Sequence, residues 1–395
     1  MPVLFFLPWV ATREEIQLGN MRLVPYVRGE APGELHGVAQ GVLDGIFGSY
    51  GNQAFHHSRT SAHVTHSTII TWENDAERSD LSDEQITSRL EMANYLAFSA
   101  LSQRRFCSLY EYCNSDGYQV VAQRFSEDRP GDTTLTTRRR DGRGQHFVGS
   151  SEIPKLIRPQ HVDGRLTLSV DATLAIALLG LPDGKLKKRI SEAIDVFLRA
   201  NTDSSTMQER SELVLMRVAF ETLLDSSHDT PGLRRCFRKH FQAELPVKPT
   251  WATGSLSEAR WRTRWPKNVE RPLDAWVQDF SAARNAAAHG PHGESEPSVW
   301  QRHNHLLFSS WLFPLMVKKL LAVEGMYELQ EEDVVARRGF EAFFAHDLLA
   351  FADGEERDLW WNRVERNLLL SVYANALFSA SEDDDDDDTE ADKSG

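Results

Sequence analysis

The chain has 395 residues, 41% of them hydrophobic and 26% charged, and a formal net charge of −14 at pH 7. This length predicts two or three domains, and this composition is typical of a protein with apolar cores. Three cysteines, none in a Cys-x-x-Cys pair, exclude a disulfide scaffold and a cysteine-rich zinc protein, and they indicate a reducing cytosol.

Residues 1–165 are expected to form an α+β domain. The apolar start, Val3–Leu7, lacks the basic flank and cleavage site of a signal peptide, so a buried first strand is expected. A helical period over Asp83–Cys107 predicts one long helix against a sheet. Further strands are predicted at Met21–Tyr26, Thr68–Trp72, Tyr118–Val121, Thr133–Thr137 and Gln145–Val148. The domain is a candidate sensor, or a docking site for an activating protein or ligand.

From residue 166 onward the apolar residues follow a helical period, which predicts an all-α bundle over 166–325. Its four main helices are expected over Lys185–Ala200, Thr206–Asp225, Pro272–His289 and Pro297–Val323. The last of these is apolar on most of its surface and is expected to be buried. No apolar run reaches the roughly 18 to 20 residues that cross a bilayer, so a cytoplasmic location without a membrane partner is expected.

Two more segments complete the predicted organisation. A helical extension is expected over 326–380, and residues 381–395 are too polar to fold. This acidic tail carries a net charge of −8, and the other 380 residues share −6. The tail either keeps the protein soluble or competes with nucleic acid for a basic groove.

A basic, tryptophan-rich insert over 231–276 separates the second and third helices. It holds ten Lys or Arg against four Asp or Glu, with four interleaved tryptophans. Cations for phosphates and flat rings for unpaired bases suit single-stranded nucleic acid. The predicted RNA-binding residues are Arg260, Trp261, Arg262, Arg264, Trp265 and Lys267. The alternative is that the tryptophans belong to the core and the arginines are solvated or paired.

The third helix ends in a polar motif, with Arg284, Asn285 and His289 separated by three alanines and followed by Gly290. The Arg–His spacing alone is expected about once by chance in this composition. Asn285 and His289 are four residues apart, so the amide is expected to orient the imidazole. The negative end of the helix dipole favours a protonated His289. Such a polar helix end is poorly explained as core.

This helix end resembles the Arg-x(4–6)-His signature of HEPN domains, the helical domains of many RNA-cleaving toxins and defence proteins. The preceding helices, with Ala-Phe-Glu-Thr-Leu-Leu at 219–224, are similar to those of the ApeA-like HEPN group, although Phe220 stands where that group has leucine. The resemblance covers about residues 185–325. The long basic insert departs from the compact four-helix pattern, and residues 1–165 resemble nothing specific.

The resemblance implies a metal-independent endoribonuclease that cleaves RNA through its 2′-hydroxyl, without a cofactor or a metal. His289 would serve as base or acid and Arg284 would bind the phosphate. HEPN domains typically form homodimers, which would bring both residues of two chains around one cleft. The expected role is a toxin-like effector in antiviral (phage) defence. The alternative is a non-catalytic RNA-binding or assembly module that uses a HEPN dimer as scaffold.

The second helix contributes one more candidate, Glu221. Its carboxylate either accepts a hydrogen bond from Arg284, orders the site from the second helix, or faces solvent. His303 and His305, at the start of the fourth helix, either line the cleft or belong to an ordinary helix start. The histidines between 56 and 66 are interpreted as part of a polar loop and not as metal ligands.

Overall fold

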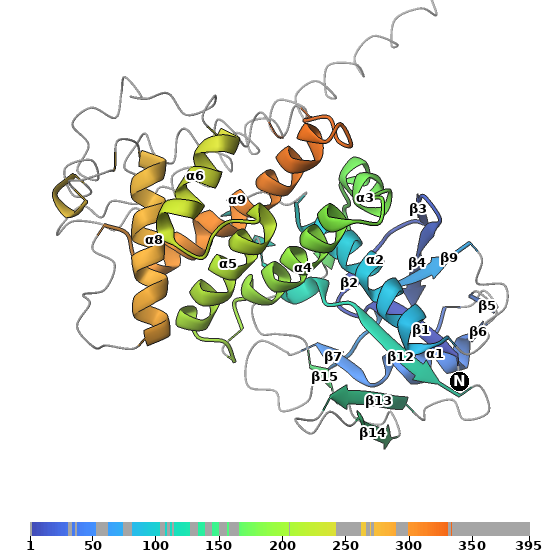
Figure 1. Cartoon of the computed structure of the whole chain (residues 1–395). Helices are drawn as coiled ribbons and strands as arrows, with labels where there is room; N and C mark the ends of the chain where they lie inside the picture. Colours follow the sequence, from blue (N-terminus) through green and yellow to red (C-terminus); the bar gives the residue numbers. More distant parts are fainter. Residues whose placement is uncertain are drawn as a thin grey trace, which may run out of the picture.

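The computed structural model describes residues 2–30, 34–35, 38–52, 62–73, 81–102, 107–108, 111–112, 114–126, 133–138, 144–149, 156–157, 166–204, 206–241, 262–265, 269, 272–289, 299–330 and 333. The N-terminal part contains a sheet of antiparallel strands, and the C-terminal half is mostly helical (Figure 1). The expected order, α+β followed by helices, is confirmed at this level.

The main sheet has seven antiparallel strands in the order β14-β13-β12-β1-β9-β4-β3. Strand β1 lies in the middle because its apolar residues suit burial on both faces. The strands are β1 (Val3–Leu7), β3 (Ile16–Leu18), β4 (Met21–Val27), β9 (His66–Trp72), β12 (Val121–Phe125), β13 (Thr133–Arg138) and β14 (Gly144–Gly149). The predicted strand at Tyr118–Val121 instead begins at Val121, because Asp116–Tyr118 forms a 3₁₀ turn, η1.

Short strands extend this framework. They are β2 (Val10–Ala11), β5 (Glu34–Leu35), β6 (Val38–Ala39), β7 (Tyr50–Asn52), β8 (Ala62–His63), β10 (Cys107–Ser108), β11 (Glu111–Tyr112), β15 (Leu156–Ile157) and β16 (Leu166–Thr167). Strand β16 pairs in parallel with β2, so the chain returns to the first strands before it enters the helical half.

The two faces of the sheet pack into different apolar clusters. Leu4 and Phe6 pack with α1 (Gln40–Phe47), whereas Phe5 and Leu7 belong to the cluster that contains α2 (Asp83–Ser102). This alternation follows from the period of two in a strand. The predicted long helix is therefore confirmed as α2, which ends at Ser102.

The described residues of the C-terminal half include the helices α3 (Ala172–Leu179), α4 (Lys185–Ala200), α5 (Glu209–Leu224), α6 (Thr230–Phe241), α8 (Pro272–His289) and α9 (Arg302–Val323). Helix α5 contacts α4, α8 and α9 and is central to the bundle. The bounds of α4 and α8 match those predicted, and α5 and α9 begin a few residues later than predicted. Helix α6 lies within the basic insert, where no helix was expected.

Helix α9 is buried on most of its surface, as predicted. Within the described ranges it is the one helix whose length and composition would also suit a membrane span. In the most apolar stretch of α9, 72% is buried inside the molecule. The predicted helices beyond residue 333 and the acidic tail lie outside the described residues.

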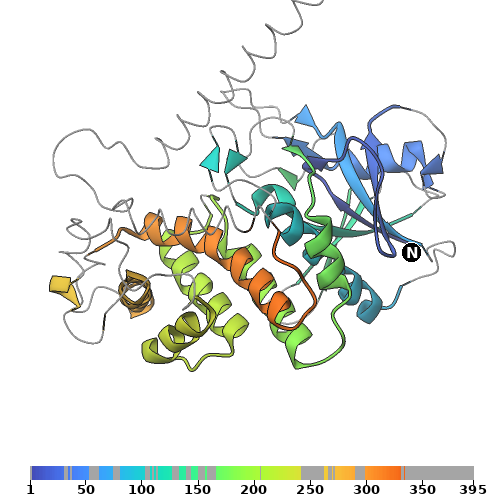
Figure 2. The ribbon, with the colours of Figure 1, turned by 90° about the horizontal axis from the view of Figure 1, so that it is seen from above.

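One apolar core connects the sheet to the helices, which lie side by side in Figure 2. The ring of Phe98 on α2 lies 5.8 Å from that of Phe197 on α4 and 6.0 Å from that of Phe313 on α9. The backbone N–H of Ser115 also donates to the carbonyl of Asn201, at 2.7 Å. The predicted boundary near residue 165 stays a prediction, and the core is continuous across it.

Candidate functional site

Helix α8 is anchored at its first turns and reaches the surface at its last. The fully buried Trp276 stacks on Phe280, with ring centroids 5.0 Å apart, and meets the ring of Phe308 edge-on. After the buried Ala283 the exposure rises: Arg284 is half-buried and Asn285 is exposed. The alanines that follow add little bulk, so the last turn presents its polar side chains at the surface.

Arg284 has an unused hydrogen-bond donor. Its Nη1 donates to Oδ1 of Asn285 at 3.1 Å, while its Nε is buried without a partner among the described residues. A buried N–H without an acceptor costs free energy, so the packing of the described residues around Arg284 leaves one of its donors unsatisfied. The carboxamide oxygen of Asn285 accepts the bond from Nη1 of Arg284, and the expected contact of Asn285 with His289 stays a prediction. His289 is the last residue of α8, and its side chain lies outside what the structure describes.

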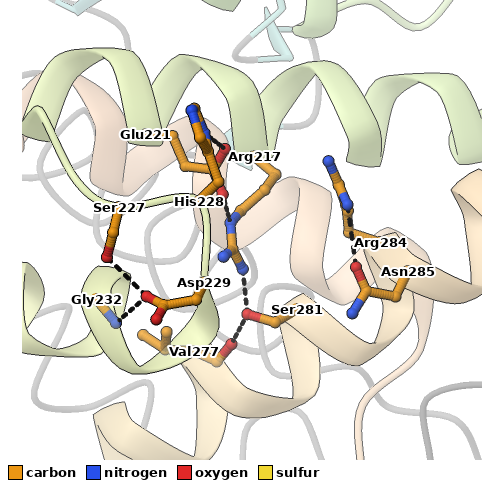
Figure 3. A network of polar contacts seen from close by, with 10 residues as sticks. All are labelled: Arg217, Glu221, Ser227, His228, Asp229, Gly232, Val277, Ser281, Arg284 and Asn285. Atoms are coloured by element: carbon orange, nitrogen blue, oxygen red, sulfur yellow. Dashed lines mark hydrogen bonds and ion pairs between the residues drawn. The ribbon is translucent and has the colours of Figure 1, made fainter.

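A buried ion pair lies next to Arg284 on the facing helix, α5. Arg217 donates from Nε to Oε1 of Glu221 at 2.6 Å, and the two side chains are 4% and 8% exposed. Arg217 also donates from Nη1 to the hydroxyl of Ser281 on α8, which donates to the carbonyl of Val277 at 2.5 Å (Figure 3). These contacts connect α5 to α8 one turn before Arg284.

The charges of this network act on one another. Burial lowers the pKa of Arg217, and the hydrogen bond and negative charge of Glu221 oppose this effect. The positive charge of Arg284 lowers the pKa of Arg217 further. The guanidinium groups of Arg217 and Arg284 therefore lie close enough to repel each other. The carboxylate of Glu221 pairs with Arg217 and is buried, so it neither accepts the hydrogen bond considered from Arg284 nor faces solvent.

The turn between α5 and α6 brings a histidine to this network. His228 is 95% exposed, and its Nδ1 lies 3.4 Å from Oε2 of Glu221. Asp229 caps α6, because its Oδ1 accepts hydrogen bonds from the backbone N–H of Gly232 and the hydroxyl of Ser227, both at 2.7 Å. The bond from Ser227, followed by that from Gly232, lowers the pKa of Asp229.

Sequence reasoning did not single out Arg217, His228 or Ser281. A signal for the first was present, because Arg217 and Glu221 are spaced by four residues within an otherwise apolar helix stripe. Ser281 and His228 join the network only because of how α5, α8 and the turn after α5 pack together. No local sequence pattern predicts that packing.

The basic insert is described in part. Arg262 and Arg264 are exposed, and the guanidinium of Arg264 lies 4.5 Å from the ring centroid of Trp265. The indole N–H of Trp265 donates to Asp279 at 3.3 Å, and Trp276 belongs to the core. Trp265 and Trp276 thus fit the alternative interpretation of the insert, in which its tryptophans pack inside the protein. Arg260, Trp261 and Lys267 lie outside the described residues.

The two histidines at the start of α9 are placed differently. His305 is fully buried, and its Nε2 lies 3.2 Å from Oδ2 of Asp279, which also accepts from the backbone N–H of Trp300. His305 therefore connects α8 to α9 within the core. His303 is half-buried, and burial lowers its pKa. Among the described residues, no group of three or more His, Cys, Asp or Glu is arranged to hold a metal ion.

Comparisons of the chain with protein-family models, curated protein sequences and solved structures find no match. The function proposed below therefore rests on the residues of this chain.

Proposed function

We propose that this protein is a metal-independent endoribonuclease of HEPN type, in which Arg284 and His289 carry the reaction. The single observation that best supports it is Arg284 itself. This arginine lies at the surface end of α8, five residues before the terminal His289, and its Nε–H has no partner among the residues that the structure describes. Toxin-like activity in antiviral defence, in the cytoplasm, is the corresponding biological proposal.

The chemistry suits these residue types. Attack of the RNA 2′-oxygen forms a new bond to phosphorus, and the bond to the 5′-oxygen breaks, leaving a 2′,3′-cyclic phosphate and a 5′-hydroxyl. His289 exchanges a proton with one of the two oxygens. Arg284 places its N–H donors on the non-bridging oxygens, where negative charge develops. DNA lacks the attacking hydroxyl and is not a substrate of this mechanism.

The proposal includes a homodimer and an upstream trigger. The half-buried Ala286 and Ala287 and the exposed Ala288 leave room for the close approach of a second chain beside Arg284. The N-terminal sheet would receive the activating protein or ligand.

The experiment compares wild type with Arg284→Ala and His289→Ala on labelled single-stranded RNA and on DNA of the same sequence, in EDTA. Wild type is expected to cleave only RNA, and each variant to lose about 100-fold or more of the rate. Arg199→Ala is the matched control, because Arg199 pairs with Asp195 on the exposed face of α4. Cleavage that needs a divalent metal, or cleavage of DNA, would contradict the mechanism.

The second candidate function is a non-catalytic RNA-binding or assembly module. The exposed Arg262 and Arg264 favour this second function, because arginines at the surface can bind RNA phosphates whether or not His289 takes part in a reaction. RNA binding by wild type without cleavage, unchanged in His289→Ala, would select this alternative.

A further inference from the structure

The turn between α5 and α6 presents an imidazole that is backed by a buried carboxylate. One oxygen of Glu221 is held by Arg217 at 2.6 Å, and the other lies 3.4 Å from Nδ1 of His228. A carboxylate fixed beside Nδ1 selects the imidazole form that has a proton on Nδ1. Nε2 of the exposed ring is then the nitrogen that exchanges a proton with a ligand. A buried acid that orients a histidine is a recurring arrangement in proton-transfer sites.

The backbone that carries His228 is held in place on both sides. The hydroxyl of Ser227 donates to Oδ1 of Asp229 at 2.7 Å, and the same oxygen caps α6 by accepting from the N–H of Gly232. A Cβ added to Gly232 would overlap the side chains of Ser227 and Asp229. The N–H of Ser226 also donates to the carbonyl of Glu221 at 3.1 Å. Such an anchored turn places the imidazole at little further entropic cost when a substrate binds.

Arg284 lies between this imidazole and the end of α8. Figure 3 shows Arg217 between His228 on one side and Arg284 on the other, and the charge of Arg284 acts on Arg217. Arg217 bonds to Ser281, and an α-helix rises 1.5 Å per residue. Arg284 therefore follows Ser281 by about 4.5 Å along the axis of α8, and His289 follows by about 12 Å.

We propose that His228 is a second proton-transfer residue of this site and that it protonates the leaving 5′-oxygen of RNA. The assignment rests on the proposed function. In-line displacement at phosphorus needs a base at the attacking oxygen and an acid at the opposite, leaving oxygen. A histidine at each end of the site, with Arg284 on the phosphate between them, meets this need within one chain. The dimer then need not supply the second histidine.

The step balances as follows. His289 accepts the proton of the 2′-hydroxyl as the 2′-oxygen bonds to phosphorus. The electron pair of the breaking bond goes to the 5′-oxygen, which takes the proton on Nε2 of a doubly protonated His228. Glu221 keeps its hydrogen bond to Nδ1 throughout, and water later returns both histidines to their starting forms.

The test uses the full-length protein and two RNA substrates that differ in one atom. One has the natural 5′-oxygen at the scissile bond, and the other has sulfur in its place, a leaving group that departs without a proton. His228→Ala is expected to lose about 100-fold or more on the oxygen substrate and to stay within about tenfold of wild type on the sulfur substrate. His289→Ala is expected to be slow on both. His66→Ala, at an imidazole on β9, is the matched control.

The outcomes separate the two proposals. Cleavage of the oxygen substrate by His228→Ala at the wild-type rate, or an equal loss on both substrates, would overturn the role of His228 and leave the nuclease intact. Inactivity of wild type on both RNAs would remove the nuclease and this assignment together. Nitrogen NMR of the His228 ring gives a readout besides activity: the neutral ring is expected to carry its proton on Nδ1, and a neutral ring protonated on Nε2 alone would contradict the contact with Glu221.

Discussion

Arg217 and Glu221, one turn apart on α5, form an ion pair of 2.6 Å in which neither side chain is more than 8% exposed. Burial of two charges costs free energy that good geometry only offsets, so such a pair adds little net stability. What it adds is position: it connects α5 to Ser281 of α8 and presents a fixed carboxylate to His228. The pair therefore has consequences for both stability and activity.

Removal of one partner of this pair is expected to cost more than removal of both. Arg217→Met leaves a buried carboxylate without a cation and should lower the free energy of unfolding by about 3–5 kcal/mol. The double variant Arg217→Met/Glu221→Met should recover most of that loss. Urea unfolding followed by circular dichroism measures both changes. Arg199→Met breaks a pair whose arginine is 70% exposed and should cost less than about 1 kcal/mol. A double variant less stable than the single one would contradict this account.

A side chain at Gly232 is expected to disrupt the cap of α6. In Gly232→Ala the added Cβ would displace Ser227 and Asp229, so the cap of α6 is lost at a cost of about 1–2 kcal/mol. Displacement of the turn should also slow RNA cleavage, because it moves His228. Gly41→Ala is the control, since a Cβ there meets nothing within 4 Å and alanine favours a helix. Thermal unfolding and cleavage rates of the two variants test this, and equal effects at both sites would refute it.

Glu212 predicts a pH dependence of stability. Burial, together with the negative charges of Asp203, Glu209 and Asp116, raises the pKa of Glu212 from 4.5 to about 8. The folded state then binds more protons than the unfolded state between these values, so stability should fall as the pH rises from about 4.5 to about 8. Glu212→Gln removes this proton and should abolish that part of the decline.

The measurement is the melting temperature of wild type and Glu212→Gln at pH 5 and pH 8.5. The melting temperature of Glu212→Gln relative to that of wild type is expected to be higher at pH 8.5 than at pH 5. The lowered pKa values of Asp225 and Asp229 affect stability only near and below pH 4. The lowered pKa values of His240 and His303 affect wild type and Glu212→Gln alike, so they cancel in the comparison. A difference between the two proteins that stays constant with pH would show that Glu212 is ionised in the fold.

Local patterns in the sequence were enough to predict several of the regular elements of this protein. The bounds of β1, α4 and α8 follow from apolar periodicity and from the residues that end each segment. These signals are local, because a helix or strand buries one face at a fixed period whatever it packs against. The surface position of Arg284 and Asn285 followed in the same way, from a polar helix end next to small residues.

The tertiary structure alone decided which polar groups meet. Arg284 and Asn285 are neighbours in the sequence, yet only the structure shows that the guanidinium of Arg284 donates to the Asn285 oxygen. Glu221 pairs with Arg217 of its own helix. His228 contacts Glu221 from a turn, where no hydrophobic periodicity could predict the contact. Each buried donor or acceptor must find some partner, but which one depends on how α5 and α8 pack. That packing brings together residues 64 positions apart, such as Arg217 and Ser281, beyond the reach of any local pattern.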